Sequence, residues 1–287
     1  MHVVIVGTGP AGVSAALYAR RGGADVTVVA KDDGALSAVD RIENYYGFEE
    51  PISGAELLRR GSEGARRLGV VFERDEVLGF ALPPEGNGYI VVGRQRSYEA
   101  DALILAAGAQ RAGLPVAGIR AFEGHGVSSC AVCDAFFYRG RHVAVIGAGA
   151  YAQHEAQILL PHAARVTLLT NGAAPEVPFP PAVSVDTRRL LHVEGERRVE
   201  RIVFADETPL DVDGIFLAVG VAGSTALAKK LGVRLDGSRI AVDAHMATNV
   251  SHVYAAGDCT GGLMQIAKAV YEGAAAGLAA VHHLRRG

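Results

Sequence analysis

Two cysteines lie in the run Cys130-Ala131-Val132-Cys133, and an acidic residue, Asp134, follows them directly. The pair lies about midway between two glycine-rich segments that begin at Gly7 and Gly147. A dithiol can hold two electrons and release them by closing a disulfide, and a glycine-rich dinucleotide site can hold a flavin or a nicotinamide. The spacing therefore indicates an electron relay.

A zinc half-site is the main alternative for a C-x-x-C pair. Zinc needs four ligands, and the sequence contains neither a second C-x-x-C nor a nearby His-x-x-x-His. We therefore favour redox use of Cys130 and Cys133 and expect no metal. The third cysteine, Cys259, has no partner in the sequence, and we expect it to be a buried small residue.

Asp134 has two possible roles beside the dithiol. If Cys133 and Asp134 begin a helix, the unpaired N–H groups there would stabilise a thiolate at Cys133. Asp134 would then be placed to carry a proton as the sulfur changes charge. It could also simply cap the helix, and the two roles do not exclude each other.

The first glycine-rich segment, Gly7-Thr8-Gly9-Pro10-Ala11-Gly12, has the complete G-x-G-x-x-G pattern (the first fingerprint). A buried strand over 2–6 precedes it, and a helix over 13–21 follows, so a pyrophosphate would lie at the N-terminus of that helix. An acidic residue that binds the adenosine ribose is expected after the next strand, over 25–30. Asp32 and Asp33 stand there, although we favour a turn role for both.

The second segment has the G-x-G-x-x-A form, with Gly147, Gly149 and Ala152 at the patterned positions (the second fingerprint, 147–152). It lies between a strand over 142–146 and a helix, and a second nucleotide site fits. The next strand, over 165–169, ends in Thr170-Asn171-Gly172, which contains neither an acid for a ribose hydroxyl nor an arginine for a 2'-phosphate. Asn171 could bind a ribose, but we favour a turn role.

Composition limits the class of protein. With 287 residues, 49% of them hydrophobic, the chain is long enough for about two globular domains. The net charge of -3 argues against nucleic-acid binding. Three cysteines and an N-terminus without a basic leader favour a cytoplasmic protein, and no apolar stretch approaches the roughly 20 residues of a membrane helix. The two strand–helix–strand units predict an α/β fold with two Rossmann-like dinucleotide-binding domains.

Together these residues resemble the low-molecular-weight thioredoxin reductase family, almost from end to end. Residues 42–48 (Ile-Glu-Asn-Tyr-Tyr-Gly-Phe) are similar to the family's E-N-[WY]-P-G segment near the flavin, with tyrosine in place of the proline. Residues 126–140 resemble the active-site segment nearly position for position. Residues 254–258 (Tyr-Ala-Ala-Gly-Asp) resemble the C-terminal flavin motif, and Gln265 matches the glutamine before the last helix.

The resemblance implies a homodimer with an FAD-binding domain formed by residues 1–111 and 238–287. A NAD(P)H-binding-like domain, residues 112–237, would be inserted between them and carry the cysteines. It implies that Cys133 faces the flavin, that Cys130 attacks the substrate disulfide, and that Asp134 is the acid. The residues expected to bind FAD are Gly7, Gly9, Pro10, Ala11, Gly12, Asn44, Gly108, Gly257, Asp258 and Gln265, and those expected to bind NAD(P)H are Gly147, Gly149 and Ala152.

The sequence departs from the family at the nicotinamide site. The H-R-R-x-x-x-R run that grips the 2'-phosphate of NADPH is replaced by Thr170-Asn171-Gly172, and Tyr151 adds bulk within the second fingerprint. We expect a flavoprotein that reduces a thioredoxin-like protein with electrons from NADPH, NADH or ferredoxin. A dithiol oxidase that uses oxygen is an alternative, although such oxidases tend to carry C-x-x-C-H. A non-enzymatic flavin-bound redox sensor is another.

Overall fold

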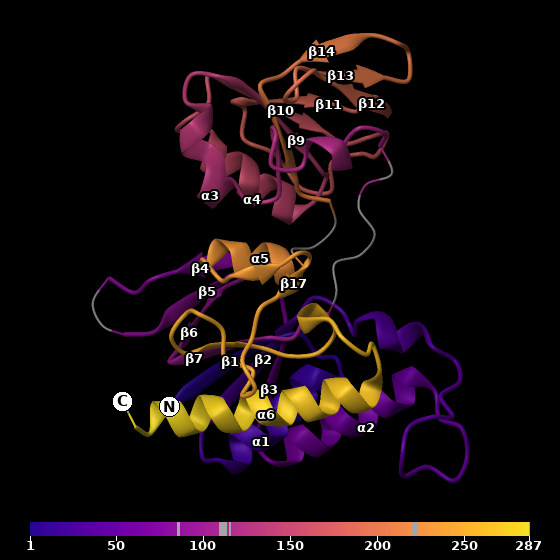
Figure 1. Cartoon of the computed structure of the whole chain (residues 1–287), viewed down its shortest axis with the longest axis vertical. Coiled ribbons are helices and arrows are strands. Elements are labelled where there is room, and N and C mark those ends of the chain that lie inside the picture. The colour runs from indigo at the N-terminus through magenta and orange to yellow at the C-terminus, as the bar shows by residue number, and fades with distance from the viewer. Residues whose placement is uncertain (85–86, 109–113, 115, 220–222, 287) are drawn as a thin grey trace. The chain divides into compact units, whose positions relative to one another are not determined.

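The computed structural model describes residues 1–84, 87–108, 114, 116–219 and 223–286. Contacts divide the chain into a terminal unit, Met1–Arg111 with Gly223–Gly287, and an inserted unit, Ala112–Ala222 (Figure 1). The first boundary between the units falls outside the described residues. We expected the inserted unit to extend to residue 237. The contacts instead place residues 223–237 in the terminal unit, because helix α5 (Ser224–Lys230) packs on β4 (Val77–Ala81) and β17 (Arg239–Ile240).

A five-stranded parallel sheet forms the centre of the terminal unit, in the order β18-β7-β1-β2-β3. Strands β1, β7 and β18 are apolar and buried on both faces, as is usual in a parallel sheet, whereas the edge strand β3 is partly exposed. Val3, Val4 and Ile5 of the central strand are fully buried. The strands are β1 (His2–Val6), β2 (Asp25–Ala30), β3 (Val71–Arg74), β7 (Ala102–Leu105) and β18 (Val253–Ala255).

Two helices, α1 (Pro10–Arg21) and α6 (Ile266–Leu284), lie side by side on this sheet (Figure 1). Their backbones approach so closely that a Cβ on Gly273 would overlap the carbonyl oxygen of Ala11, and one on Gly277 would overlap that of Ala15. Small residues are therefore required along this seam. The other elements of the unit are α2 (Gly54–Arg67), η1 (Ala35–Ala38), η4 (Asp258–Thr260), the antiparallel β4 (Val77–Ala81), β5 (Tyr89–Gly93) and β6 (Ser97–Ala100), and the short pair β16 (Leu235–Asp236) and β17 (Arg239–Ile240).

The inserted unit has a second parallel sheet, in the order β11-β10-β9-β15-β8. Its strands are β8 (Val127–Ser128), β9 (His142–Ile146), β10 (Arg165–Leu169), β11 (Val183–Asp186) and β15 (Gly214–Leu217). Helix α4 (Ala150–Leu159) connects β9 to β10, and the short α3 (Ala131–Asp134) and η3 (Ala135–Tyr138) follow β8. The remaining elements are η2 (Arg120–Phe122) and an antiparallel sheet of β12 (Leu190–Glu194), β13 (Arg201–Phe204) and β14 (Pro209–Asp211).

The two units repeat a hydrogen-bonding pattern at the start of their first strands. In the terminal unit, His2 Nε2 lies 2.9 Å from Thr27 Oγ1 on the neighbouring strand, and in the inserted unit His142 Nε2 lies 2.9 Å from Thr167 Oγ1. The N–H of each histidine donates to an aspartate, Asp101 at 2.7 Å and Asp213 at 3.0 Å. The predicted α/β fold with two Rossmann-like units is confirmed, and the strands predicted over 2–6, 25–30, 142–146 and 165–169 match β1, β2, β9 and β10.

Helix α6 is long, but none of the helices in the described part of the chain combines the length and apolar composition needed to cross a bilayer.

The seam between α1 and α6 makes a testable prediction. Gly273→Ala should lower the free energy of unfolding by about 1–3 kcal/mol, because the added methyl must displace the backbone of α1. The matched control is Gly64→Ala within α2, where an added Cβ meets nothing within 4 Å. This control should raise stability by about 0.5–1 kcal/mol, because alanine favours the helix. Urea unfolding measures both; equal effects would contradict the packing argument.

Candidate functional site

The first fingerprint folds into a turn that only glycine permits. Gly7 has φ +117°, and a Cβ on it would overlap the carbonyl oxygen of Ala106, while one on Gly12 would overlap that of Gly7. By contrast, a Cβ on Gly9 would meet nothing within 4 Å. Helix α1 begins directly after Gly9 with Pro10 and has no side-chain cap. The N–H groups at this helix end are therefore left for an anion such as a pyrophosphate.

The other residues expected to bind FAD come from neighbouring parts of the same unit. Gly108 and Gly257 follow β7 and β18, which lie in succession on one side of β1 in this parallel sheet, so the turns after the three strands lie at one edge. A Cβ on Gly257, which has φ +90°, would lie 2.9 Å from the Cβ of Ala11. Asn44 Nδ2 donates to Gln265 Oε1 at 3.0 Å across 221 positions of sequence. Folding thus brings Asn44 and Gln265 together.

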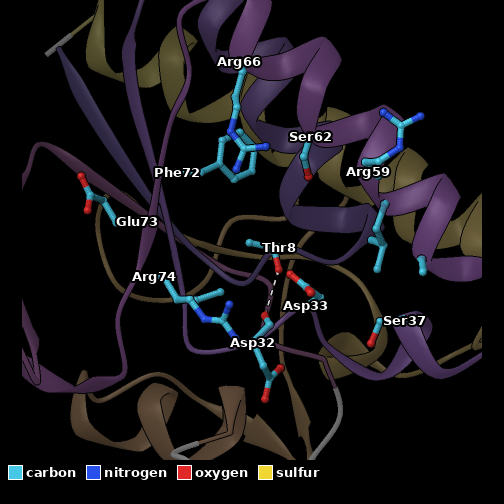
Figure 2. Close-up of a pocket in the computed structure, with 13 residues that line it drawn as sticks. Thr8, Asp32, Asp33, Ser37, Arg59, Ser62, Arg66, Phe72, Glu73 and Arg74 are labelled. Carbon is cyan, nitrogen blue, oxygen red and sulfur yellow. Dashed lines mark hydrogen bonds between the residues drawn. The ribbon is translucent and has the colours of Figure 1, made fainter.

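A pocket of about 320 Å³ opens at the edge of the sheet where β1, β2 and β3 end (Figure 2). Thr8 Oγ1 donates to the backbone oxygen of Asp32 at 3.2 Å, and Asp32 Oδ1 accepts from Gly34 N at 2.9 Å. Asp32 is therefore a turn residue, as expected. Asp33 also lines the pocket (Figure 2), so it is an acid that could meet a ribose there.

Three arginines, Arg59, Arg66 and Arg74, also line this pocket, and the sequence analysis did not single them out. Arg59 and Arg66 stand seven positions apart on α2, a spacing that puts them on one helix face and could have indicated them. Arg59 is bound by Glu56, whose pKa is lowered to about 2 by its hydrogen bonds with Arg59 and then Arg60. The open glycine turn, the acid and the cations fit the phosphates and ribose of a dinucleotide.

Cys130 and Cys133 form a disulfide, with their Cα atoms 5.4 Å apart. The helix considered for Cys133 and Asp134 begins earlier, at Ala131. Cys130 has extended backbone angles, so α3 starts only after it, and Cys130 is the N-cap. Its Sγ accepts a hydrogen bond from Cys133 N at 3.2 Å. Cys130 is only 2% exposed, whereas Cys133 lies in the surface of the chain.

Helix α4 fixes the backbone on both sides of Cys130. The buried carboxylate of Glu155 accepts from Ala131 N at 2.7 Å, and the hydroxyl of Tyr151 donates to the Ser129 carbonyl at 3.1 Å. Burial, together with the neighbouring charge of Glu155, raises the pKa of Tyr151, so its hydroxyl stays a donor. The sequence analysis noted Tyr151 only for its bulk and missed Glu155, although their i, i+4 spacing places them on one helix face.

Asp134 is the last residue of α3 and is half-buried. It stands at the N-cap of η3, but its side chain makes no capping hydrogen bond there. Burial, with the charge of Asp134 next, raises the pKa of Tyr138. Three large apolar side chains beside the disulfide are exposed to solvent, Val132, Phe136 and Phe137.

The second fingerprint forms the same kind of turn as the first, but the space beside its second glycine is occupied. A Cβ on Gly147 would overlap the carbonyl oxygen of Ala218, so Gly147 allows the close packing that the first glycine of a fingerprint provides. The same Cβ would also come close to Ala152. A Cβ on Gly149, however, would lie 2.8 Å from Glu176 Oε2. The backbone N–H of Glu176 also donates to the Ala148 carbonyl at 2.8 Å. A carboxylate therefore stands where a pyrophosphate would approach the helix.

Asn171 at the end of β10 is a turn residue, as favoured. It has φ +52°, and its Oδ1 accepts from Leu190 N at 2.8 Å. Thr170-Asn171-Gly172 itself contains no arginine, but the fold brings one beside it. Arg189, on the chain between β11 and β12, lies beside Gly172, where a Cβ would be 3.0 Å from Arg189 Cγ. Sequence spacing alone did not reveal Arg189.

Cys259 is buried, and its Sγ donates to the carbonyl oxygens of Ala256 and Leu105 at 3.4 and 3.5 Å. Burial raises the pKa of its thiol to about 11. It is therefore a small core residue, as expected.

The family model described as pyridine nucleotide-disulphide oxidoreductase matches residues 1–273 of this chain. The chain is 34% identical over 276 residues to a thioredoxin reductase of Aquifex aeolicus (strain VF5), covering 89% of this chain and 84% of that protein. Its fold matches the atypical thioredoxin reductase TRi from Desulfovibrio vulgaris Hildenborough with a TM-score of 0.92 at 37% identity, covering 99% of this chain and 98% of the other.

A second solved structure with a similar fold is a ferredoxin-flavin thioredoxin reductase from Clostridium acetobutylicum. Its TM-score is 0.73 at 32% identity, with 100% of this chain and 98% of the other covered. The match to the family model spans nearly the whole chain, both dinucleotide turns and the disulfide between them. The chain therefore belongs to the pyridine nucleotide-disulphide oxidoreductase family, as a FAD-dependent oxidoreductase of the thioredoxin reductase type.

Proposed function

We propose that this protein reduces the disulfide of a thioredoxin-like protein, using electrons that pass from reduced ferredoxin through FAD to the Cys130–Cys133 pair. The observation that carries the proposal is the disulfide itself. It lies in the inserted unit of a chain from a flavin-dependent family, with one sulfur exposed and large apolar side chains around it. Relatives named thioredoxin reductases support the choice of substrate.

The FAD site belongs to the terminal unit. Gly7, Gly9 and Gly12 admit the pyrophosphate to the N-terminus of α1, where Pro10 and Ala11 begin the helix. Asp33 is placed for the ribose, and Arg59, Arg66 and Arg74 supply positive charge beside it. The remaining residues that we assign to FAD are Asn44, Gly108, Gly257, Asp258 and Gln265. Bound FAD takes up and releases an electron pair.

The positions of the two sulfurs support a division of labour between them. Cys133, the exposed sulfur, receives the electron pair, and the disulfide bond breaks to leave Cys130 as a thiolate. That sulfur already accepts the Cys133 N–H, which stabilises the charge. Asp134 follows directly and exchanges the proton that Cys133 gains or loses. Cys130, exposed by movement once the disulfide is open, then attacks the substrate disulfide.

The surface beside the disulfide supports a protein substrate rather than a small one. Val132, Phe136 and Phe137 are each more than half exposed, at 55%, 64% and 71%; Val132 lies between the cysteines in α3, and the two phenylalanines follow them in η3. Arg139 lies over the ring of Phe136, 4.9 Å from its centroid. Exposed apolar side chains grouped around a reactive centre are typical of protein docking sites.

Ferredoxin is supported as the donor by the second fingerprint. A nicotinamide dinucleotide must bring its negative pyrophosphate to Gly149, and the carboxylate of Glu176 stands at that glycine. The hydroxyl of Tyr151, within the second fingerprint, donates to the Ser129 carbonyl just before Cys130. Arg189 could attract an adenosine phosphate, but that attraction does not remove the opposing charge at Gly149. The ferredoxin-flavin thioredoxin reductase from Clostridium acetobutylicum gives a precedent for ferredoxin.

The donor can be identified by the absorbance of the flavin under anaerobic conditions. Reduced ferredoxin should bleach the visible flavin band within the mixing time of a stopped-flow experiment. NADPH and NADH at millimolar concentration should leave it oxidised, because Glu176 opposes the pyrophosphate. Bleaching by NADPH at a rate that supports turnover would overturn the assignment of the donor and give Arg189 the role of a phosphate ligand.

The roles of the two sulfurs can be separated by single substitutions. Cys130→Ser and Cys133→Ser should each lower thioredoxin reduction at least about a hundredfold, because the dithiol cannot form, while bound FAD is unchanged. Cys133→Ser should displace thionitrobenzoate from a single-cysteine thioredoxin carrying it as a mixed disulfide, and Cys130→Ser should not. The reverse pattern would exchange the two roles.

We expect the protein to be a homodimer. Tyr271 and Leu278 stand seven positions apart and form an apolar stripe on one face of α6, and Met264 lies just before that helix. All three side chains are more than half exposed, at 65%, 52% and 60%, and interfaces cover exposed apolar side chains of this kind.

The oligomeric state gives a direct test of this stripe. Light scattering after gel filtration should give twice the chain mass of 29.9 kDa. Tyr271→Asp should shift the mass toward that of one chain, because it puts a charge into an apolar contact. Arg201→Ala, an exposed control in the inserted unit, should leave the dimer intact. A single-chain mass for the unaltered protein would refute the dimer.

A further inference from the structure

A buried ion pair holds the turn at Gly257 from helix α6. Lys268 Nζ and Glu272 Oε2 lie 2.9 Å apart, one helical turn from each other, with side chains only 15% and 11% exposed. Glu272 Oε2 accepts the Gly257 N–H at 2.8 Å, and Lys268 Nζ donates to the Gly257 carbonyl at 2.7 Å. Both backbone groups of one glycine are therefore bound by opposite charges.

The hydroxyl of Thr260 completes this network. It lies 2.8 Å from both Glu272 Oε2 and Lys268 Nζ, so it can accept from the ammonium and donate to the carboxylate. The short helix η4 (Asp258–Thr260) is thereby fixed at both ends, at Gly257 before it and at Thr260 within it. The turn has one conformation as long as both charges are present.

The position of this turn gives the network a consequence for the cofactor. Gly257 lies against Ala11 at the N-terminus of α1, where the first fingerprint presents its N–H groups. Asp258 comes next, and among the described residues none forms a hydrogen bond or ion pair with its carboxylate. An acidic side chain kept free on a rigid turn beside a phosphate-binding helix end is available to a ligand.

The chemistry of the pair indicates positioning rather than general stability. Two apolar residues of similar size often stabilise a core as well as or better than a buried ion pair does, because both charges must lose their hydration. A carboxylate bound to the N–H of Gly257 and an ammonium bound to its carbonyl, however, specify the orientation of the peptide groups on both sides of this residue. The orientation of the peptide group after Gly257 sets the position of the Asp258 Cα, from which its side chain extends.

We propose that Lys268 and Glu272 are positioning residues for the flavin. They hold the Gly257–Asp258 turn in the orientation that lets Asp258 contact bound FAD, and they thereby set the affinity for FAD and the reduction potential of the bound flavin. The proposal rests on the FAD site assigned above and adds two residues that do not themselves touch the cofactor.

The test measures FAD binding to the apoprotein of the full-length chain by flavin fluorescence. Lys268→Met and Glu272→Gln keep most of the side-chain volume and remove one charge each. Each should weaken FAD binding by about tenfold to a hundredfold, the range for loss of a hydrogen bond to a charged group. In the FAD that remains bound, the reduction potential and the visible circular dichroism should shift. Asp25→Asn, which breaks the exposed Arg20–Asp25 pair, is the control and should change neither.

Exchange of the two charges separates positioning from helix stability. The double variant Lys268→Glu with Glu272→Lys retains an i, i+4 pair on α6 but presents the ammonium to Gly257 N–H and the carboxylate to its carbonyl. Positioning predicts that FAD binding stays weak in this variant, whereas a purely helix-stabilising pair would restore it. Restored binding would overturn the proposal.

Two further outcomes are distinguishable. The positioning role alone would be overturned if the variants bound FAD as tightly as the unaltered protein. It would also be overturned if near-ultraviolet circular dichroism showed that the fraction of variant unable to bind FAD equals the fraction of apoprotein that is unfolded. An unaltered protein that binds no FAD would instead overturn the cofactor site itself.

Discussion

The close approach of backbone segments around the N-terminus of α1 is the constraint on which the rest of the terminal unit depends. Gly7 and Gly12 must lack side chains so that the turn can close, and Gly273 and Gly277 must lack them so that α6 can lie against α1. The same approach brings Gly257 to Ala11. Because these contacts are between main chains, they fix the geometry of the phosphate-binding end more firmly than flexible side chains could. The Lys268–Glu272 pair then holds the Gly257 turn, which Asp258 follows directly.

The inserted unit uses the same framework for a different purpose. Its strands start with the same histidine–threonine and histidine–aspartate hydrogen bonds, and Gly147 packs as a first glycine does. At the second glycine the units diverge, because Gly9 faces open space whereas Gly149 faces the carboxylate of Glu176. The helix after the second fingerprint supports the redox centre instead, through Glu155 and Tyr151. In the inserted unit, a Rossmann-like architecture thus supports the backbone on both sides of Cys130 in the disulfide.

The disulfide illustrates how local backbone conformation assigns chemistry. The sequence places Cys130 and Cys133 at a spacing that allows a bond, but the extended backbone of Cys130 makes it the residue that precedes the helix. Its sulfur therefore receives the N–H of Cys133, while Cys133 stays accessible. Which sulfur is better suited to leave as a thiolate follows from this one hydrogen bond. Neither the spacing nor the residue types could have shown it.

The sequence by itself determined the two strand–turn–helix units and the redox pair, because each depends on residues within about 30 positions of one another, where periodicity and glycine spacing act directly. It also indicated Asn44, Gly257 and Gln265, but only through resemblance. Tertiary structure decided the rest. Asn44 meets Gln265, and Gly257 meets Ala11, because the order of strands in the sheet brings distant segments together. Glu176, Arg189 and the charges of α6 lie within about 30 positions of the groups that they reach, but only the packing of whole elements turns them toward those groups, and no periodicity or glycine spacing encodes that packing.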